Sequence, residues 1–454
     1  NERMTFNVSF NNNSINLISG YPKLIPNTVS VVGNPFFYSP VCFDINNDGK
    51  DEIFINTSSG LFGFRNNGIP ILSNTTGLIL SNAGLKPTAF AFAPALSPSN
   101  RVISTFNNGI VSLGFDNNFN LVDTQIDSFP SLSISSNVLV FDSSKVLIGF
   151  NNKIYSKSLT ASNPSLFVDS ISGASQLSKF GNYSFIRSNS IFTRVLSGNM
   201  IFNNTIDSLR ISSNNNISEY FINGTPFPNK YGFRLSDSSL VTLADIDRDG
   251  RQDILFVSEG KVFALDYNGV IKEYFPAKIN GYVKSGISVA DVNNDGLYDA
   301  IFVTDAGDLY AYGSNGKIVP GYPVKTAPTT STPALFNYND TLGIVIFNKN
   351  SVNSNNFYAY KTNVRYDDSK ILWRNVFGDK YLSNSNLKLA SNTVTYSGLL
   401  PAEKTYNWPN PVYNDVTYIR YYLNGFASSV SIKILDLSGE LVTTFPGTNF
   451  PKTD

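Results

Sequence analysis

Three short stretches of this chain carry the same order of acids, amides and a glycine. The most acidic of them reads DIDRDGRQD from Asp245 to Asp253 and leads directly into β-branched and aromatic residues. Side chains that end in oxygen occupy positions 1, 3, 5 and 9, and a glycine occupies position 6. Ca2+ prefers about six to eight oxygen ligands, and a glycine in the turn allows the acidic side chains to converge. This stretch therefore predicts a calcium-binding loop that runs into a strand.

The same pattern occurs as DINNDGKDE from Asp44 and as DVNNDGLYD from Asp291. A single such loop could equally be a hairpin turn with solvated acids, but three copies favour metal binding. Position 7 would contribute its backbone carbonyl, and the Asp245 loop, with four carboxylates, should bind Ca2+ most tightly if ligand charge dominates the affinity. The expected ligands are Asp44, Asn46, Asp48, Lys50, Glu52, Asp245, Asp247, Asp249, Arg251, Asp253, Asp291, Asn293, Asp295, Leu297 and Asp299.

The composition argues against several other functions. Lysine plus arginine equals aspartate plus glutamate at 34 each, so no net charge attracts nucleic acid or an anionic membrane, and we expect no nucleic-acid partner. The chain has no histidine, which excludes a histidine base and histidine-bound zinc. No apolar run is long enough to span a membrane. The single cysteine, Cys42, has apolar neighbours and is expected to be buried.

Strand signals dominate the sequence, and helix signals are almost absent. Short runs of Val, Ile, Phe and Tyr alternate with clusters of Asn, Gly, Ser and Pro, a pattern typical of an all-β protein. Asp245 and Asp291 are 46 residues apart, and 46 more residues lead to Asn337, where a copy without the glycine and the final acid resembles a degenerate loop. One repeat thus comprises about four short strands, as in a β-propeller blade.

We predict a β-propeller of about seven blades over residues 1–380, with six or eight blades as alternatives. The segment Met4–Phe10 is expected to supply a strand to the last blade, so that no sheet edge stays open. Residues 381–403 are expected to form a linker, and residues 404–454 a second domain. The predicted blades lie near residues 40–80, 90–125, 133–165, 178–220, 240–275, 286–320 and 332–380, with residues 1–20 closing the ring.

The acidic loops and the strands that follow them resemble the FG-GAP or VCBS repeats of integrin-α-like β-propellers. The resemblance covers about residues 20–370, closely at three repeats and more loosely elsewhere. In that family the loop binds a structural Ca2+ ion on the outer rim of a blade. The resemblance therefore implies about three calcium ions, each of which holds down a loop of clustered negative charge.

A second resemblance lies near the C-terminus. The segment YNWPNP from Tyr406 is followed by TYIRYYL from Thr417 and by VSIKILDLSGELV from Val430. These segments resemble the start of the immunoglobulin-like C-terminal sorting domain of bacterial type IX secretion substrates, with Trp408 in place of a tyrosine. Because such a β-sandwich needs about seven strands, the resemblance implies a partial domain over residues 404–454.

These features favour an exported, non-catalytic β-propeller, stabilised by Ca2+, that presents a surface for binding or assembly with a protein or glycan at the bacterial cell surface. The chain opens on Asn1 and has no signal segment, so we expect a mature product whose signal peptide has been removed.

Two alternatives remain open. One is a calcium-dependent polysaccharide lyase or hydrolase, which would need a base near the ion or a pair of carboxylates; Asp367 and Asp368 are expected to be a solvated turn instead of such a pair. The other is a lectin-like glycan binder, for which Tyr366 and Trp373 are the candidate contacts, because both lie outside the clear strand pattern.

Overall fold

The computed structural model divides the chain into an N-terminal unit, Asn1–Ala390, and a C-terminal unit, Ser391–Asp454. The structure describes residues 15–26, 39–57, 60–81, 87–96, 99–106, 109–128, 139–140, 145–150, 153–158, 165–168, 174–180, 183–188, 191–196, 199–201, 208–211, 217–222, 225–228, 242–249, 252–266, 270–349, 354–379, 398–400, 405–413, 416–421, 423 and 425–447.

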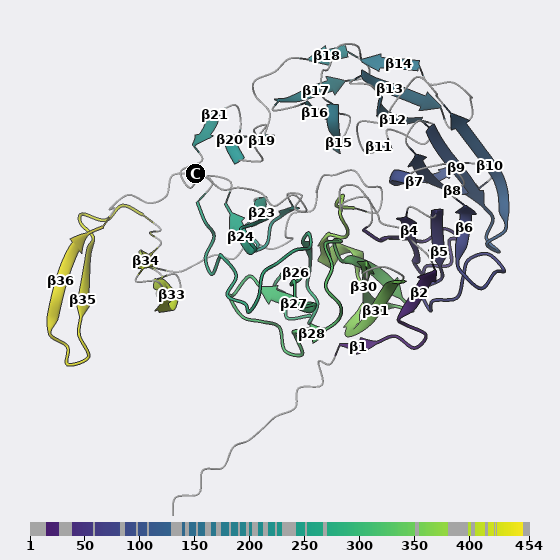
Figure 1. Cartoon of the computed structure of the whole chain (residues 1–454). Coiled ribbons are helices and arrows are strands. Elements are labelled where there is room, and N and C mark those ends of the chain that lie inside the picture. Colours follow the sequence, from purple (N-terminus) through teal and green to yellow (C-terminus); the bar gives the residue numbers. More distant parts are fainter. Residues whose placement is uncertain are drawn as a thin grey trace, which may run out of the picture. The chain divides into compact units, whose positions relative to one another are not determined.

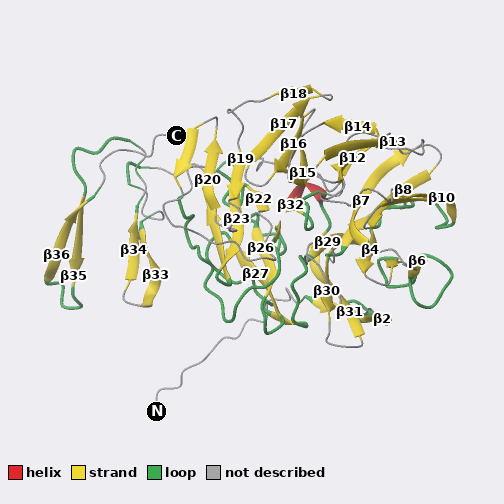
Figure 2. Ribbon diagram, turned by 45° about the horizontal axis from the view of Figure 1, so that its top comes forward, coloured by secondary structure: helices red, strands yellow, loops and turns green. Residues whose placement is uncertain are grey.

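Antiparallel sheets make up the described part of the N-terminal unit. Eight of them follow one another along the sequence, and in most of them each strand pairs with the next one (Figure 1). The one helical element among the described residues is a single 3-10 turn, η2 (Asp368–Lys370) (Figure 2). The described chain is therefore all-β, as predicted. It includes no helix with the length and apolar character needed to cross a bilayer.

The first five sheets use their strands in sequence order. The first contains β3 (Val41–Phe43), β4 (Glu52–Thr57), β5 (Gly60–Phe64) and β6 (Leu78–Ser81). The second contains β7 (Pro87–Leu96), β8 (Ser99–Phe106), β9 (Gly109–Phe115) and β10 (Leu121–Ser128). The third contains β11 (Leu139–Val140), β12 (Lys145–Phe150), β13 (Lys153–Ser158) and β14 (Ser165–Val168). The fourth contains β15 (Ala174–Phe180), β16 (Tyr183–Ser188), β17 (Ile191–Leu196) and β18 (Asn199–Ile201), and the fifth β19 (Ser208–Ile211), β20 (Ile217–Ile222) and β21 (Thr225–Pro228).

The last three sheets carry the acidic loops at 245 and 291 and the degenerate copy at 337. The sixth contains β22 (Thr242–Ala244), β23 (Asp253–Ser258) and β24 (Lys261–Leu265). The seventh contains β25 (Ser288–Ala290), β26 (Asp299–Val303), β27 (Asp308–Gly313), β28 (Val324–Lys325) and the later strand β32 (Ile371–Trp373). The eighth contains β29 (Ala334–Tyr338), β30 (Thr341–Lys349) and β31 (Ser354–Arg365), joined by β1 (Asn16–Leu17) and β2 (Lys23–Pro26).

The predicted number of seven blades is not confirmed. The range 178–220, predicted as one blade, coincides with two sheets, β15–β18 and β19–β21. The physical reason lies in the sequence between the first and second acidic loops, where no loop of this kind marks the start of a repeat. Strand patterns alone do not show where one sheet ends and the next begins.

Central strands are buried on both faces, because alternate residues pack toward different neighbouring sheets. In β4, Phe54 belongs to a cluster that includes Val102 of β8. Its neighbour Ile53 belongs to another cluster, with Cys42 of β3 and Phe347 of β30. Cys42 is thus a buried side chain, as predicted. Burial of a side chain such as Phe54 or Ile53 contributes about 1.5–3 kcal/mol to the hydrophobic free energy of folding.

N-terminal residues add to the edge of the eighth sheet. Asn16 of β1 pairs with Lys361 of β31, and Lys23 of β2 pairs with Phe357 of the same strand. The segment Met4–Phe10, predicted to complete the last blade, lies outside the described residues. The N-terminal strands that the structure describes in this sheet are β1 and β2.

Two hairpins are described in the C-terminal unit. β33 (Tyr406–Tyr413) pairs with β34 (Val416–Arg420), and β35 (Ser431–Leu435) pairs with β36 (Leu441–Pro446). The turn of the second hairpin is held by Asp436, whose Oδ1 accepts the N–H groups of Ser438 and Glu440, both at 2.9 Å. An immunoglobulin-like sandwich is not confirmed by these four described strands. Of the predicted linker, 381–403, the structure describes only residues 398–400.

Candidate metal centres

Each of the three acidic loops connects two antiparallel strands of one sheet. The loops join β3 to β4, β22 to β23 and β25 to β26, and the acid at position 9 is the first residue of the second strand in every case. This acid pairs with the residue that precedes position 1, in the pairs Phe43–Glu52, Ala244–Asp253 and Ala290–Asp299. All three loops therefore have the same register.

A buried carboxylate closes each loop at position 9. Its residue is at most 2 % exposed in all three loops, and one of its oxygens accepts a hydrogen bond from the backbone N–H at position 2. The donor and acceptor are Ile45 and Glu52 at 3.0 Å, Ile246 and Asp253 at 3.1 Å, and Val292 and Asp299 at 3.0 Å. The bond orients the carboxylate and leaves its second oxygen as a candidate metal ligand.

The carboxylate at position 1 fixes the turn. Asp44 accepts the N–H groups of Asp48 at 3.1 Å and of Gly49 at 2.8 Å. Gly49 has a φ of 83°, in the left-handed region that glycine adopts without strain. The Asp291 loop repeats this arrangement, with bonds from Asp295 at 3.2 Å and from Gly296 at 3.1 Å, and with a φ of 84° at Gly296.

Position 7 lies against the carboxylate at position 5. The backbone N–H of Lys50 donates to Asp48 at 2.9 Å, and that of Leu297 donates to Asp295 at 2.8 Å. Lys50 and Leu297 therefore lie beside the predicted metal sites, to which their backbone carbonyls were expected to contribute a ligand. Arg251, the corresponding residue of the Asp245 loop, lies outside the described residues.

The amide at position 3 contacts neighbouring acids in two of the loops. In the Asp44 loop the amide nitrogen of Asn46 donates to Asp44 Oδ1 at 3.0 Å and to Asp48 Oδ1 at 3.3 Å. In the Asp291 loop Asn293 likewise donates to Asp295 Oδ2, at 2.9 Å. Carboxylate and amide side chains gathered in this way can supply the oxygen ligands that a hard cation such as Ca2+ prefers.

Burial raises the pKa values of the acids in these loops. It raises the pKa of Glu52 to about 9, against an opposing hydrogen bond from the Ile45 N–H. It raises the pKa of Asp299 well above its usual range. The pKa values of Asp44 and Asp291 are also raised by burial, although loop amides oppose the shift. The charged form of these carboxylates is therefore disfavoured in the metal-free fold, and a cation would reverse that preference.

These raised pKa values predict that the melting temperature in chelator and its increase on adding Ca2+ change in opposite directions as the pH rises. A raised pKa in the folded state stabilises the fold below the unfolded-state pKa of about 4.3, and that contribution is lost as the pH rises toward about 9 at Glu52. We therefore expect the melting temperature in chelator to fall between pH 5.5 and 8.5, while the increase in melting temperature on adding Ca2+ grows. Thermal scans across this pH range measure the melting temperature in chelator and its increase with Ca2+. In the control variant Glu52→Gln, the melting temperature in chelator should change less with pH. A melting temperature in chelator that rises across this window would contradict the assignment.

A lysine lies among the acids of the Asp245 loop. In the described part of the chain, one group of three acids has ligand oxygens all within 4.8 Å of one another, and it consists of Asp245, Asp247 and Asp253. The ammonium nitrogen of Lys272 lies 2.6 Å from Asp247 Oδ2 and 2.8 Å from Asp253 Oδ1. It is 3.7 Å from Oδ2 of Asp249. Lys272 was not among the residues predicted for this site from the sequence.

The degenerate copy at Asn337 supports the Asp44 loop. The Asn337 amide donates to the carbonyl of Gly49 at 2.6 Å, and its backbone N–H donates to Asp51 Oδ2 at 2.7 Å. The same Asp51 oxygen accepts from the buried guanidinium of Arg374 at 2.8 Å. Residues far apart in sequence thus hold the first acidic loop in place. The sequence signal for this support is the acid at position 8, Asp51, which the other two loops lack.

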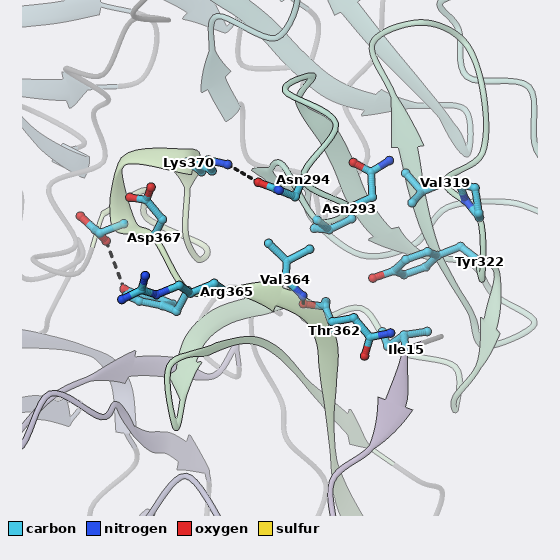
Figure 3. Close-up of a pocket in the computed structure, with 15 residues that line it drawn as sticks. Ile15, Asn293, Asn294, Val319, Tyr322, Thr362, Val364, Arg365, Asp367 and Lys370 are labelled. Atoms are coloured by element: carbon cyan, nitrogen blue, oxygen red, sulfur yellow. Dashed lines mark hydrogen bonds between the residues drawn. The ribbon is translucent and has the colours of Figure 1, made fainter. Parts of the chain in front are cut away.

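A polar pocket of about 910 Å3 lies beside the Asp291 loop (Figure 3). Its lining includes Asn293, Asn294, Thr362, Arg365 and Tyr366. Amide, hydroxyl and guanidinium groups of this kind can hydrogen-bond a sugar or another polar ligand.

The two aromatic residues proposed as glycan contacts have different environments. Tyr366 lines the pocket, and its hydroxyl donates to Asp368 Oδ1 at 3.3 Å. Trp373 is 1 % exposed and belongs to the hydrophobic cluster around β26, so no ligand can reach it in this fold. The prediction for Trp373 was wrong because this residue continues an apolar strand, β32, whose partner is distant in the sequence.

The turn at Asp367 is ordinary local structure. Asp367 caps η2 and accepts the N–H of Ser369 at 2.9 Å. Asp368 instead forms an ion pair with Arg374 at 2.6 Å. The two adjacent acids therefore have separate structural partners.

Residues 245–302 match the family model of the FG-GAP-like repeat. The match includes the Asp245 and Asp291 loops and the strands that follow them. It covers a small part of the chain and identifies this segment as similar to that repeat. No curated protein sequence matches the chain.

Several solved structures resemble the fold at low sequence identity. BBS1N in its complex with ARL6DN is 10% identical, with a TM-score of 0.43, and the alignment covers 76% of this chain and 97% of that one. BamB from Moraxella catarrhalis is 15% identical over 69% of this chain and 83% of its own, with a TM-score of 0.31. The extracellular domain of a putative one component system from B. thetaiotaomicron is 13% identical over 73% of this chain and 39% of its own, with a TM-score of 0.37.

Proposed function

We propose that this chain is an exported, non-catalytic binding or assembly module of the β-propeller type, in which calcium stabilises the acidic loops. The observation that carries the proposal is the repeated loop geometry. Two loops, at Asp44 and Asp291, have the same hydrogen bonds at positions 1, 5 and 9, and each offers three carboxylates and one amide as ligands.

Calcium in these loops would act on stability and not on a reaction. Bound between oxygens at positions 1, 3 and 5 and the buried acid at position 9, a divalent cation compensates negative charge that burial disfavours. Because only the folded loop assembles these ligands, binding free energy adds to the free energy of folding. The ligands come from the chain's own side chains and from the carbonyls of Lys50 and Leu297.

Export to the bacterial surface is part of the proposal. It is supported by the resemblance of the C-terminal segments to a type IX sorting domain. The partner is proposed to be a protein or a glycan. Turnover of a pectin or alginate panel by the purified chain would overturn the non-catalytic part and favour the lyase or hydrolase alternative.

A glycan-binding function is the second candidate, and the pocket beside the Asp291 loop favours it. Its lining groups are hydrogen-bonding, and its two basic residues, Arg365 and Lys370, are balanced by Asp367 and Asp368, which suits a neutral sugar. Binding to a glycan array that disappears in Arg365→Ala, and persists in Trp373→Phe, would support this candidate. A chain that binds no member of the array would not.

The calcium proposal is tested by Asp299→Asn. This change keeps an oxygen that can accept the Val292 N–H but removes the charge at position 9, so we expect one Ca2+ ion fewer and a calcium-dependent rise in melting temperature smaller by several degrees. Asp436→Asn, in a hairpin turn of the C-terminal unit, is the matched control and should change neither quantity. Equal calcium content in both variants and the native chain would contradict the site.

A further inference from the structure

The residue Lys272 occupies a repeated position at which the other two acidic loops have an aliphatic side chain. In each of the three sheets, a residue shortly after the third strand (β5, β24 or β27) donates its backbone N–H to a carbonyl of that strand. These bonds are Ile71 to Gly63 at 3.1 Å, Lys272 to Ala264 at 2.7 Å and Val319 to Ala311 at 2.9 Å. The residue before each one forms an isolated bridge, in the pairs Phe64–Pro70, Leu265–Ile271 and Tyr312–Ile318. Ile71, Lys272 and Val319 are therefore structural equivalents.

All three side chains are buried, but only one carries charge. Ile71 is 3 % exposed, Val319 is 4 % exposed and Lys272 is 8 % exposed. A buried ammonium is strongly disfavoured unless it is paired. Lys272 satisfies this requirement with Asp247 and Asp253, the acids at positions 3 and 9 of its loop.

The ammonium therefore lies where the ligand oxygens of the loop converge. A calcium ion bound by the same oxygens would lie about 2.3–2.6 Å from them. The Lys272 nitrogen contacts these oxygens at 2.6 and 2.8 Å. Two cations that share the same oxygens at such distances repel each other strongly in a buried site.

We propose that the Lys272 ammonium takes the place of calcium in the Asp245 loop, so that the chain binds two Ca2+ ions, at the Asp44 and Asp291 loops. This inference rests on the proposed function, in which those two loops hold calcium. It reverses the order of affinity expected from counting carboxylates, because the loop with four acids carries its own cation. The acids Asp247 and Asp253 are then paired with a cation at any calcium concentration.

The test exchanges the side chains between equivalent positions in the full chain. Lys272→Met keeps an unbranched side chain of similar length and removes the charge, and Val319→Lys introduces a charge beside the Asp291 loop. Bound Ca2+ is counted by equilibrium dialysis and by native mass spectrometry. We expect two ions in the native chain, three in Lys272→Met and one in Val319→Lys.

Three ions in the native chain, with no gain in Lys272→Met, would overturn this inference and leave the proposed function standing. No ions in the native chain but one in Lys272→Met would support the role of the lysine and overturn calcium at the other two loops. No ions in either would overturn both. The native count needs no variant, so the inference remains testable if Lys272→Met fails to fold.

Discussion

Replacing Arg374 by methionine is expected to lower the free energy of unfolding by about 3–5 kcal/mol, because the change leaves a buried acid without its partner. The Arg374 guanidinium contacts Asp51 Oδ2 at 2.8 Å and Asp368 Oδ1 at 2.6 Å. The side chains of Arg374 and Asp51 are 3% and 9% exposed. Asp51 also accepts the N–H of Asn337, so the loss extends to the support of the Asp44 loop. Urea denaturation of the variant and of the native chain measures the difference.

Two controls identify the buried charge as the cause. The double variant Arg374→Met with Asp51→Leu removes both charges and should recover part of the loss, since a buried pair replaced by apolar residues costs much less than a broken one. Lys325→Met breaks the pair of a 67% exposed lysine with Asp308 and should cost less than about 1 kcal/mol. Equal losses in Arg374→Met and Lys325→Met would contradict the account.

Truncation of Trp373 to alanine is expected to destabilise the fold by about 3–5 kcal/mol, the range for removing a buried aromatic side chain. Trp373 of β32 pairs with Val289 of β25 and packs in the cluster that includes Phe302. The lectin hypothesis predicts a different result, a stable protein that has lost glycan binding. Tyr282→Ala, at a residue that is 61 % exposed, should change the free energy of unfolding by about 0.5 kcal/mol. A Trp373→Ala variant as stable as Tyr282→Ala would contradict the assignment of Trp373 to the core.

The local part of the candidate sites was predictable from the sequence. Oxygen-bearing residues at fixed spacing, followed by a strand, require a particular turn, and the structure places Asp44, Asp48 and Glu52 in it with the expected glycine at position 6. The all-β class was predictable for the same reason, because strand and turn signals depend on neighbouring residues.

Contacts between distant residues were not predictable in this way. Arg374 and Asp51 are 323 residues apart, and nothing in either local sequence identifies the other. Lys272 did leave a signal, since it replaces the aliphatic residues Ile71 and Val319 in the repeat. That signal becomes clear only when the backbone hydrogen bonds establish that the three positions are equivalent.

Thermal unfolding of the full chain in excess chelator and with increasing Ca2+, with bound calcium counted in the same samples, tests whether calcium stabilises the acidic loops. At a free Ca2+ concentration of 100 times the dissociation constant, each occupied site should add about 2.7 kcal/mol to the free energy of unfolding. We expect a melting temperature that rises steeply with Ca2+ and two bound ions per chain. A chain that contains no calcium and melts at the same temperature in both conditions would show that the loops are hairpins held by their own hydrogen bonds.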